Sequence, residues 1–151
     1  MKVLFTVPFI SYISDKPPIL QDLGLGYMAQ VIRKEGHDVS IRDWCMDPDP
    51  EKYVSLLKDE APDVVAMKVF TKDVGAAVRT IETIRAAVPS AMIVVGGPHP
   101  SAVPPEDCFS DIKGIDYAIQ GEGAHLVDLV EGSYTNVIGL PLPEVAGWLR
   151  V

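Results

Sequence analysis

The sequence has few cysteines and no long apolar run, and each shortage excludes a class of protein. Only 2 of the 151 residues are cysteine, Cys45 and Cys108, and they form no Cys-x-x-Cys pair. Neither a disulfide framework nor a paired-cysteine metal site is therefore expected. No stretch reaches the roughly 18 apolar residues that a membrane-spanning helix needs. The N-terminal apolar run is also too short for a signal peptide, so we expect a cytoplasmic protein with no membrane partner.

Basic residues are also scarce. The chain has 13 Lys and Arg against 21 Asp and Glu, which gives a formal net charge of -8 at pH 7. Such a surface repels polyphosphate backbones and anionic membranes. We therefore expect no nucleic-acid partner.

Paired metal ligands are missing as well. His37, His99 and His125 form no short ligand motif with each other or with the cysteines. The acidic loop 43–49 lacks the glycine and the terminal glutamate of a calcium loop. The sequence therefore predicts no metal ion held by protein ligands, and no arrangement of side chains indicates a catalytic residue.

What is present is an alternation of strand-length apolar runs with segments of helical periodicity, which is typical of a parallel sheet. Strands are predicted at Lys2–Val7, Asp38–Asp43, Asp63–Val69, Ala91–Val95 and Ile115–Ile119. Helices are predicted at about Asp22–Glu35, Pro50–Glu60, Val74–Val88 and Ala124–Glu131, with a single turn near Pro105–Phe109. Five strands in one domain favour an α/β fold of the flavodoxin-like (Rossmann-type), doubly wound kind, with three layers, α/β/α.

Ligands of such sheets bind outside the C-terminal ends of the strands. Four segments would meet there: Pro8–Gln21, Phe70–Asp73, Gly96–Pro105 and Gln120–Gly123. Three of them are rich in glycine or proline. This composition favours a site that presents backbone groups to a ligand rather than many charged side chains.

A nucleotide is one candidate ligand. Gly24 and Gly26 begin a Gly-x-Gly-x-x-Ala pattern, and Asp43 follows at close to the expected spacing of about 20 residues. The loop Pro8–Gln21 separates these glycines from the first strand, however, so they would lie inside the first helical turn. Close packing of a helix also explains small residues there. A nucleotide-binding domain that uses Gly24, Gly26 and Asp43 stays an alternative, as does a vestigial domain that only mediates protein contacts.

Six segments together resemble one family: Leu23–Met28, Lys34–Val39, Pro62–Val65, Val69–Thr71, Val94–Pro100 and Gly121–Gly123. They are similar to the N-terminal cobalamin (vitamin B12)-binding domain of cobalamin-dependent radical SAM enzymes. The resemblance covers roughly residues 1–139, and its Gly-Gly-Pro-His-Pro and Gly-Glu-Gly elements are fairly specific in combination. It implies a flavodoxin-like domain that holds a corrin over the C-terminal strand ends, and a parent enzyme that transfers methyl groups.

The resemblance also implies a set of cofactor-binding residues, because glycines let backbone N–H groups approach the corrin amides and the tail phosphate. The set is Gly24, Val69, Phe70, Thr71, Gly96, Gly97, Pro98, His99, Gly121, Glu122 and Gly123. For His99, contact with the cofactor and capping of a neighbouring carbonyl group are both open. Lys68 is expected to have a solvated tip, with direct contact to the cofactor as the alternative.

Two departures from the family pattern matter for function. The loop Pro8–Gln21 contains no histidine, whereas the wider superfamily often carries Asp-x-His-x-x-Gly there, with the histidine bound to cobalt. We therefore expect base-off cobalamin without a histidine lower ligand. The chain also lacks the Cys-x-x-x-Cys-x-x-Cys run of radical SAM enzymes, so SAM and an iron–sulfur cluster would belong only to a missing parent domain, which partners this one in cis or in trans. Residues 140–151 are expected to be a linker or the start of that missing region, and the chain alone is not expected to be catalytic.

Overall fold

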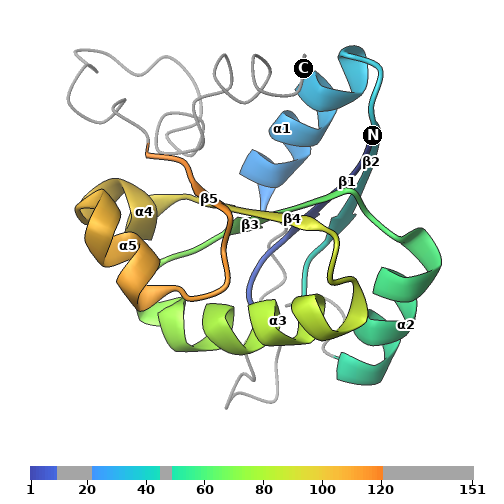
Figure 1. The fold of residues 1–151 in the computed structure, drawn as a ribbon. Coiled ribbons are helices and arrows are strands. Elements are labelled where there is room, and N and C mark those ends of the chain that lie inside the picture. Colours follow the sequence, from blue (N-terminus) through green and yellow to red (C-terminus); the bar gives the residue numbers. More distant parts are fainter. Residues whose placement is uncertain (10–21, 45–48, 121–151) are drawn as a thin grey trace, which may run out of the picture.

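The computed structural model describes residues 1–9, 22–44 and 49–120 of the chain. Five parallel strands form one sheet in the order β2-β1-β3-β4-β5, with helices on both faces (Figure 1). The strands are β1 Lys2–Thr6, β2 Asp38–Arg42, β3 Val64–Lys68, β4 Met92–Gly96 and β5 Tyr117–Ala118. The predicted α/β, flavodoxin-like fold class is therefore confirmed.

The strand β5 is much shorter than the predicted strand Ile115–Ile119. The Asp116 carboxylate accepts a hydrogen bond from the backbone N–H of Ile93, with an N···O distance of 2.7 Å. The side chain of Asp116 therefore contacts a backbone group of β4 just before the point where β5 pairs with that strand. Pairing begins with Tyr117 opposite Val94 and Ala118 opposite Val95.

The helices agree with the predicted periodicity in the described parts of the chain. They are α1 Leu23–Lys34, α2 Pro50–Glu60, α3 Val74–Ala87 and α5 Pro105–Asp111. The helix α5 is longer than the single predicted turn. The predicted helix Ala124–Glu131 lies outside the described residues.

Two short helical elements were missed. The segment Thr71–Asp73 forms a 3-10 turn, η1, and Pro98–Ala102 forms the helix α4, where the sequence suggested a loop. Pro98 takes the first helical position, where its missing N–H is not needed and its fixed φ already suits a helix. The Gly-Gly-Pro-His-Pro element is therefore the start of a helix that follows β4 directly.

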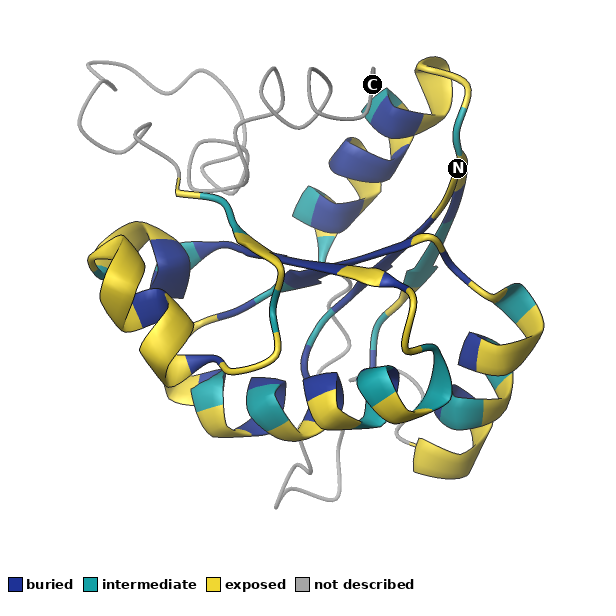
Figure 2. Cartoon of the chain, in the orientation of Figure 1, coloured by how far each residue is buried: buried dark blue, intermediate teal, exposed yellow. Residues whose placement is uncertain are grey.

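The two faces of the sheet bury separate clusters of apolar side chains. On one face, Phe5 and Ala66 pack with Met28 and Ile32 of α1. The other face, covered by α2 and α3, forms the larger cluster, which includes Leu4, Leu57, Val65, Ile81 and Ile93. Figure 2 shows that the buried residues line the sheet and the inner sides of the helices, while the outer sides of the helices are exposed. The strands β3 and β4 contribute to both clusters, as their continuous apolar sequences predict.

One aromatic cluster closes the larger core near the ends of β1 and β2. The indole of Trp44 lies 4.0 Å from the Tyr53 ring, centroid to centroid, and its Nε1 donates a hydrogen bond to Thr6 Oγ1 at 3.0 Å. Burial raises the pKa of the Tyr53 hydroxyl far above its usual value. The Cys108 thiol is also fully buried, and burial raises its pKa. Cys45 lies outside the described residues.

None of the described helices is long and apolar enough to cross a bilayer.

Candidate functional site

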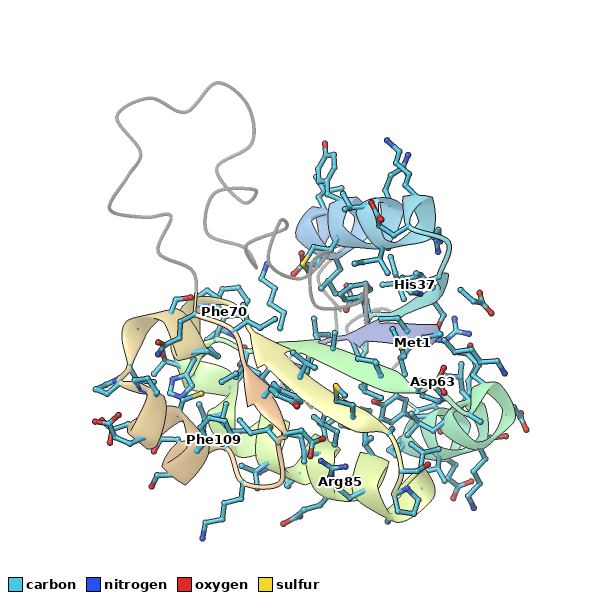
Figure 3. The ribbon with its side chains drawn as sticks, turned by 45° about the horizontal axis from the view of Figure 1, so that its top comes forward. Met1, His37, Asp63, Phe70, Arg85 and Phe109 are labelled. Atoms are coloured by element: carbon cyan, nitrogen blue, oxygen red, sulfur yellow. The ribbon has the colours of Figure 1, made fainter. Side chains whose placement is uncertain are left out.

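The C-terminal edge of the sheet is formed where β1 ends at Thr6, β3 at Lys68 and β4 at Gly96. The chain runs from β1 outward to β2 and then returns to β3, on the other side of β1. Such a switch point opens a crevice between the loops that follow the two central strands. Figure 3 shows Phe70 at this end of the molecule, and Met1 and Asp63 at the opposite end.

The segment after β3 presents one aromatic ring to solvent. Phe70 is 39% exposed and Thr71 is also exposed, whereas the Val69 side chain is fully buried in the larger core. The backbone of Val69 binds the segment after β4: its N–H donates to Gly96 O at 2.8 Å, and its carbonyl accepts from the His99 N–H at 3.0 Å. Phe70 and Thr71 are therefore placed to contact a ligand through side chains, while Val69 contributes to the shape of the edge.

Gly97 has a structural role that the sequence did not show. Its φ is +102°, and a Cβ at this position would lie 3.2 Å from Val69 O, 3.3 Å from Val69 N and 3.0 Å from Lys68 Cγ. A side chain would therefore be strained and would also press on the backbone of the neighbouring segment. Gly96 is buried beside it and Pro98 is half-buried.

His99 is brought to this edge, but its ring is turned inward and is only 2% exposed. Its Nδ1 lies 3.4 Å from Thr71 Oγ1, and its Nε2 lies 3.5 Å from Asp111 Oδ2 of α5. The two ring nitrogens thus make their polar contacts with side chains, one from η1 and one from α5. A ligand above the edge would meet Thr71 before it meets this imidazole.

Lys68 is not solvated at its tip, in contrast to the expectation from sequence. Its side chain is 12% exposed, and its Nζ lies 2.9 Å from Asp22 Oδ2. The same ammonium group lies 5.3 Å from the centre of the Phe70 ring. The lysine was expected to extend into water because it is the last residue of its strand, and its partner Asp22 is distant in the sequence.

Asp22 was missed as a candidate, although the sequence contains a signal for it. It is the N-cap of α1, and its Oδ1 accepts a hydrogen bond from the Leu25 N–H at 3.3 Å. Aspartate directly before an amphipathic helix is a typical N-cap. The second carboxylate oxygen pairs with Lys68, so Asp22 joins the start of α1 to the end of β3.

Gly24 and Gly26 lie inside the first turns of α1, as expected from the long loop before them. Gly24 is half-buried and Gly26 is exposed. No atom lies within 4 Å of the position that a Cβ of Gly26 would take. Close packing was therefore the wrong explanation for Gly26.

The remaining candidates, Gly121, Glu122 and Gly123, lie outside the described residues, as does most of the loop Pro8–Gln21. Within the described ranges, no group of three or more His, Cys, Asp or Glu residues is placed to hold a metal ion.

Two protein families match different but overlapping parts of the chain. The B12 binding domain family matches residues 14–131, and the Maf-like protein family matches residues 116–151. The dTTP/UTP pyrophosphatase of Citrifermentans bemidjiense is 69% identical over 35 residues, which are 23% of this chain and 18% of that protein. Residues 140–151, expected to be a linker or the start of a missing region, fall within the Maf-like match. The Gly-Glu-Gly element at 121–123 lies where both families match, so it does not distinguish between them.

Solved structures of similar fold include two S-adenosylmethionine radical enzymes, of which OxsB is described as cobalamin-dependent. OxsB with aqua-cobalamin and S-adenosylmethionine bound aligns with a TM-score of 0.65 and 21% identity, over 83% of this chain and 18% of that one. The radical S-adenosylmethionine methyltransferase TsrM from Kitasatospora setae aligns with a TM-score of 0.62 and 23% identity, over 83% of this chain and 24% of that one. At these identities the likeness establishes the fold, while the family follows from the longer match. Since that match covers more than half of the residues, this chain belongs to the B12 binding domain family, whose cofactor is cobalamin.

Proposed function

We propose that this domain binds base-off cobalamin at the C-terminal edge of its sheet, without a histidine lower ligand, and serves a radical SAM methyltransferase. The observation that carries the proposal is the family match together with the burial of His99. Of the described residues at this edge, His99 is the one histidine, and its ring is enclosed between Thr71 and Asp111.

The described edge residues fit a corrin. Phe70 offers an exposed apolar ring beside the crevice, and the glycines at 96 and 97 keep side chains away from the backbone after β4. A corrin is apolar over its faces and carries amide side chains at its rim, so it needs both kinds of surface. The Lys68–Asp22 pair supplies polar groups close to the Phe70 ring, whose centre lies 5.3 Å from Lys68 Nζ.

Bound cobalamin would supply a cobalt centre that carries a methyl group. The residues of this chain would bind and orient it rather than transfer protons. Phe70 would cover apolar surface, and Thr71 would offer a hydroxyl at the entrance to the site. The positive charge of Lys68 is held by Asp22, and a protonated ammonium group has no lone pair with which to coordinate cobalt.

The full proposed site comprises all of the cofactor-binding candidates from the sequence. These are Gly24, Val69, Phe70, Thr71, Gly96, Gly97, Pro98, His99, Gly121, Glu122 and Gly123. SAM and the iron–sulfur cluster would be bound by a radical SAM domain, in cis or in trans. The OxsB and TsrM chains, of which this chain spans a small part, support that arrangement.

The test is an absorbance titration of the purified chain with hydroxocobalamin and with methylcobalamin. We expect saturable binding and a shift to the base-off spectrum. The same spectrum should be obtained with His99→Ala, and with His37→Ala as the matched control at the opposite end of the sheet. A nitrogen-ligated spectrum that disappears only in His99→Ala would overturn the absence of a histidine ligand.

The titration also separates the two alternatives from the sequence. A vestigial protein-interaction domain predicts a folded chain with no spectral shift. A dinucleotide domain built on a glycine turn after β1 is disfavoured, because Gly24 and Gly26 are helical residues of α1 rather than turn residues.

A further inference from the structure

Three side chains from separate elements form a row beside the β3–β4 edge: Asp111 of α5, His99 of α4 and Thr71 of η1. The His99 Nε2 lies 3.5 Å from Asp111 Oδ2, and its Nδ1 lies 3.4 Å from Thr71 Oγ1. The imidazole is 2% exposed, whereas the Asp111 side chain is 47% exposed and Thr71 is also exposed. All three residues belong to the described part of the chain. A buried ring therefore connects two side chains that water can reach.

The backbone of α4 fixes the position of this ring. The N–H of His99 donates to Val69 O at 3.0 Å. Pro98 and Pro100 stand on either side of the histidine, and a proline ring holds φ close to the helical value. Because the ring is also enclosed between two side chains, each of its nitrogens keeps the same neighbour.

The two contacts favour the same form of the imidazole. A neutral imidazole has one N–H donor and one acceptor nitrogen, and a carboxylate ion can only accept. A proton on Nε2 would lie between the ring and Asp111, whereas a proton on Nδ1 would leave a nitrogen lone pair facing the carboxylate oxygen. Among the described residues, Nε2 has no hydrogen-bond partner that competes with this carboxylate. The contact with Asp111 therefore favours the Nε2–H form.

The form of the ring determines what the Thr71 hydroxyl can offer to a ligand. A threonine hydroxyl has one proton to donate and two lone pairs that accept. When Nδ1 is the acceptor nitrogen, that proton points toward His99, and lone pairs remain on the outer side. Such a hydroxyl binds an N–H group and leaves a phosphate oxygen, which needs a donor, unsatisfied.

We propose that Asp111 and His99 are positioning residues, which orient the Thr71 hydroxyl so that it accepts a hydrogen bond from an amide N–H at the rim of the corrin. The contact with the corrin rests on the proposed function, whereas the orientation of the hydroxyl follows from contacts within the chain. Cobalamin has two kinds of polar group that Thr71 could bind, the rim amides and the phosphate of the nucleotide tail. The relay assigns Thr71 to the amides.

Nitrogen NMR of the full chain with isotope-labelled histidine tests the orientation, at about pH 8, where an ordinary imidazole is neutral. We expect an unprotonated Nδ1 and a protonated Nε2 for His99, and His99→Gln assigns these signals by removing them. In Asp111→Asn, whose amide can also donate, the ratio of the Nε2–H to the Nδ1–H form should fall at least about fivefold. Glu106→Gln is the matched control, because it removes the same charge from an exposed position of α5 and should leave the ratio unchanged.

Calorimetric titration with cobalamin and with cobinamide, the corrin without its nucleotide tail, tests the contact with the ligand. Thr71→Val keeps the shape of the side chain but removes the hydroxyl, so the affinity for each corrin should fall about fivefold. Thr71→Ser restores a hydroxyl and should recover most of that loss. In the Asp111→Asn background the loss caused by Thr71→Val should shrink to less than about twofold, because the hydroxyl is no longer oriented.

Three results would overturn the proposal. The first is a protonated Nδ1 in His99 at about pH 8, or a ratio of the two forms that does not change in Asp111→Asn. The second is an unchanged corrin affinity in Thr71→Val. The third is a loss in Thr71→Val that occurs with cobalamin but not with cobinamide, which would place the hydroxyl on the nucleotide tail. Failure of both corrins to bind, with the Nε2–H form intact, would count against the proposed function and not against the orientation of the hydroxyl.

Discussion

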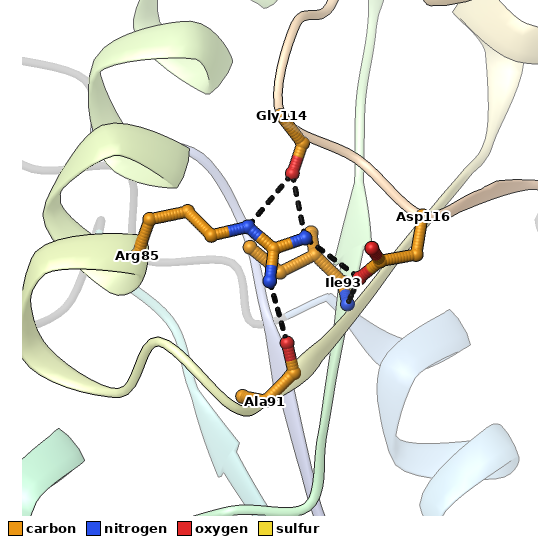
Figure 4. A network of polar contacts seen from close by, with 5 residues as sticks. All are labelled: Arg85, Ala91, Ile93, Gly114 and Asp116. Atoms are coloured by element: carbon orange, nitrogen blue, oxygen red, sulfur yellow. Dashed lines mark hydrogen bonds and ion pairs between the residues drawn. The ribbon is translucent and has the colours of Figure 1, made fainter.

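The two ends of the sheet use their polar groups differently. At the N-terminal end, the Arg85 guanidinium donates to Ala91 O at 2.8 Å, to Gly114 O at 2.8 and 3.0 Å, and to Asp116 Oδ2 at 2.6 Å (Figure 4). At the same end, Asp63 accepts a hydrogen bond from the Lys2 N–H at 2.7 Å. The C-terminal end instead presents an exposed phenylalanine, a glycine with positive φ and an inward-facing histidine.

This difference separates an end that is closed by contacts within the chain from the end at which we propose that the ligand binds. Hydrogen bonds at the N-terminal end connect α3, the residue before β4 and the segment before β5. The polar groups that make these bonds are therefore already paired within the chain. The C-terminal end leaves apolar and backbone surface available to a ligand. Substitutions at the N-terminal end should therefore change stability alone, whereas an exposed side chain at the C-terminal end, such as Phe70, can be replaced with a change in binding and little effect on stability.

Gly97→Ala should have the largest effect on stability and is best compared with Gly114→Ala. Both glycines have positive φ, +102° and +85°. A Cβ at Gly97 would press on Val69 backbone atoms, whereas one at Gly114 would meet only Ile81 Cγ2, at 3.0 Å. We expect losses of about 3 kcal/mol at Gly97 and about 1–2 kcal/mol at Gly114, measured by urea unfolding. Equal losses would show that backbone strain alone, rather than the contact with Val69, makes Gly97 necessary.

Asp22→Ala should be next in size, because it removes the N-cap of α1 and also leaves Lys68 without its carboxylate. We expect a loss of about 2 kcal/mol in the free energy of unfolding. Asp22→Asn is the control, since asparagine can still cap the helix but carries no charge, and its loss should be about 1 kcal/mol. If both variants lose the same amount, the cap contributes nothing beyond the ion pair.

Asp116→Asn should cost about 1 kcal/mol at neutral pH, because the carboxylate is partly exposed and its bonds are screened by water. Burial acts to raise the pKa of Asp116, but the Ile93 N–H and the Arg85 guanidinium outweigh it, so the pKa is lowered from 3.8. The folded state therefore favours the charged form. Its contribution is complete above the unfolded pKa and is lost as the pH falls through the lower, folded value.

The measurement for Asp116 is urea unfolding of the wild type and of Asp116→Asn between about pH 6 and pH 2. The difference between them should shrink only below about pH 4, and cobalamin binding should be the same for both at neutral pH. A difference that does not change with pH would mean that the charge of Asp116 does not contribute.

Phe70→Ala should have the smallest effect on stability and completes the comparison. The ring is 39% exposed and contributes little to either core, so the free energy of unfolding should change by no more than about 0.5 kcal/mol. Cobalamin affinity should fall about tenfold in the absorbance titration, because the apolar platform beside the crevice is lost. Phe109→Ala is the control, since Phe109 is also exposed but lies on α5. Equal affinities for the two variants would remove Phe70 from the site.

The sequence predicted the strands and long helices well because their pattern is local. Apolar residues of α3 repeat at helical spacing, and β3 and β4 are apolar throughout because both of their faces are covered. The edge was also predictable, since it follows from the order of the strands. Pairings between distant residues were not: Lys68 and Asp22 are far apart in the chain, and nothing near Lys68 indicates its partner.

Two candidate residues needed the tertiary structure for a different reason. Gly97 is a plausible cofactor contact in the sequence, but only the approach of Val69 shows that the fold itself requires glycine there. His99 is polar and lies in a Gly-Gly-Pro-His-Pro segment, which suggests exposure, yet Thr71 of η1 and Asp111 of α5 enclose its ring. Side chains near a ligand edge can therefore be assigned to it by sequence, although their direction depends on helices that pack around them.

The two hydrogen bonds of the Val69 backbone have a consequence for how fast and how tightly a ligand can bind. They tie the segment after β3 to the turn after β4, through Gly96 O and the His99 N–H. Because this part of the edge is ordered within the fold, a ligand does not have to fix it on arrival, and little conformational entropy is lost there. Association at this part of the edge should then depend on encounter and desolvation rather than on the closing of a loop.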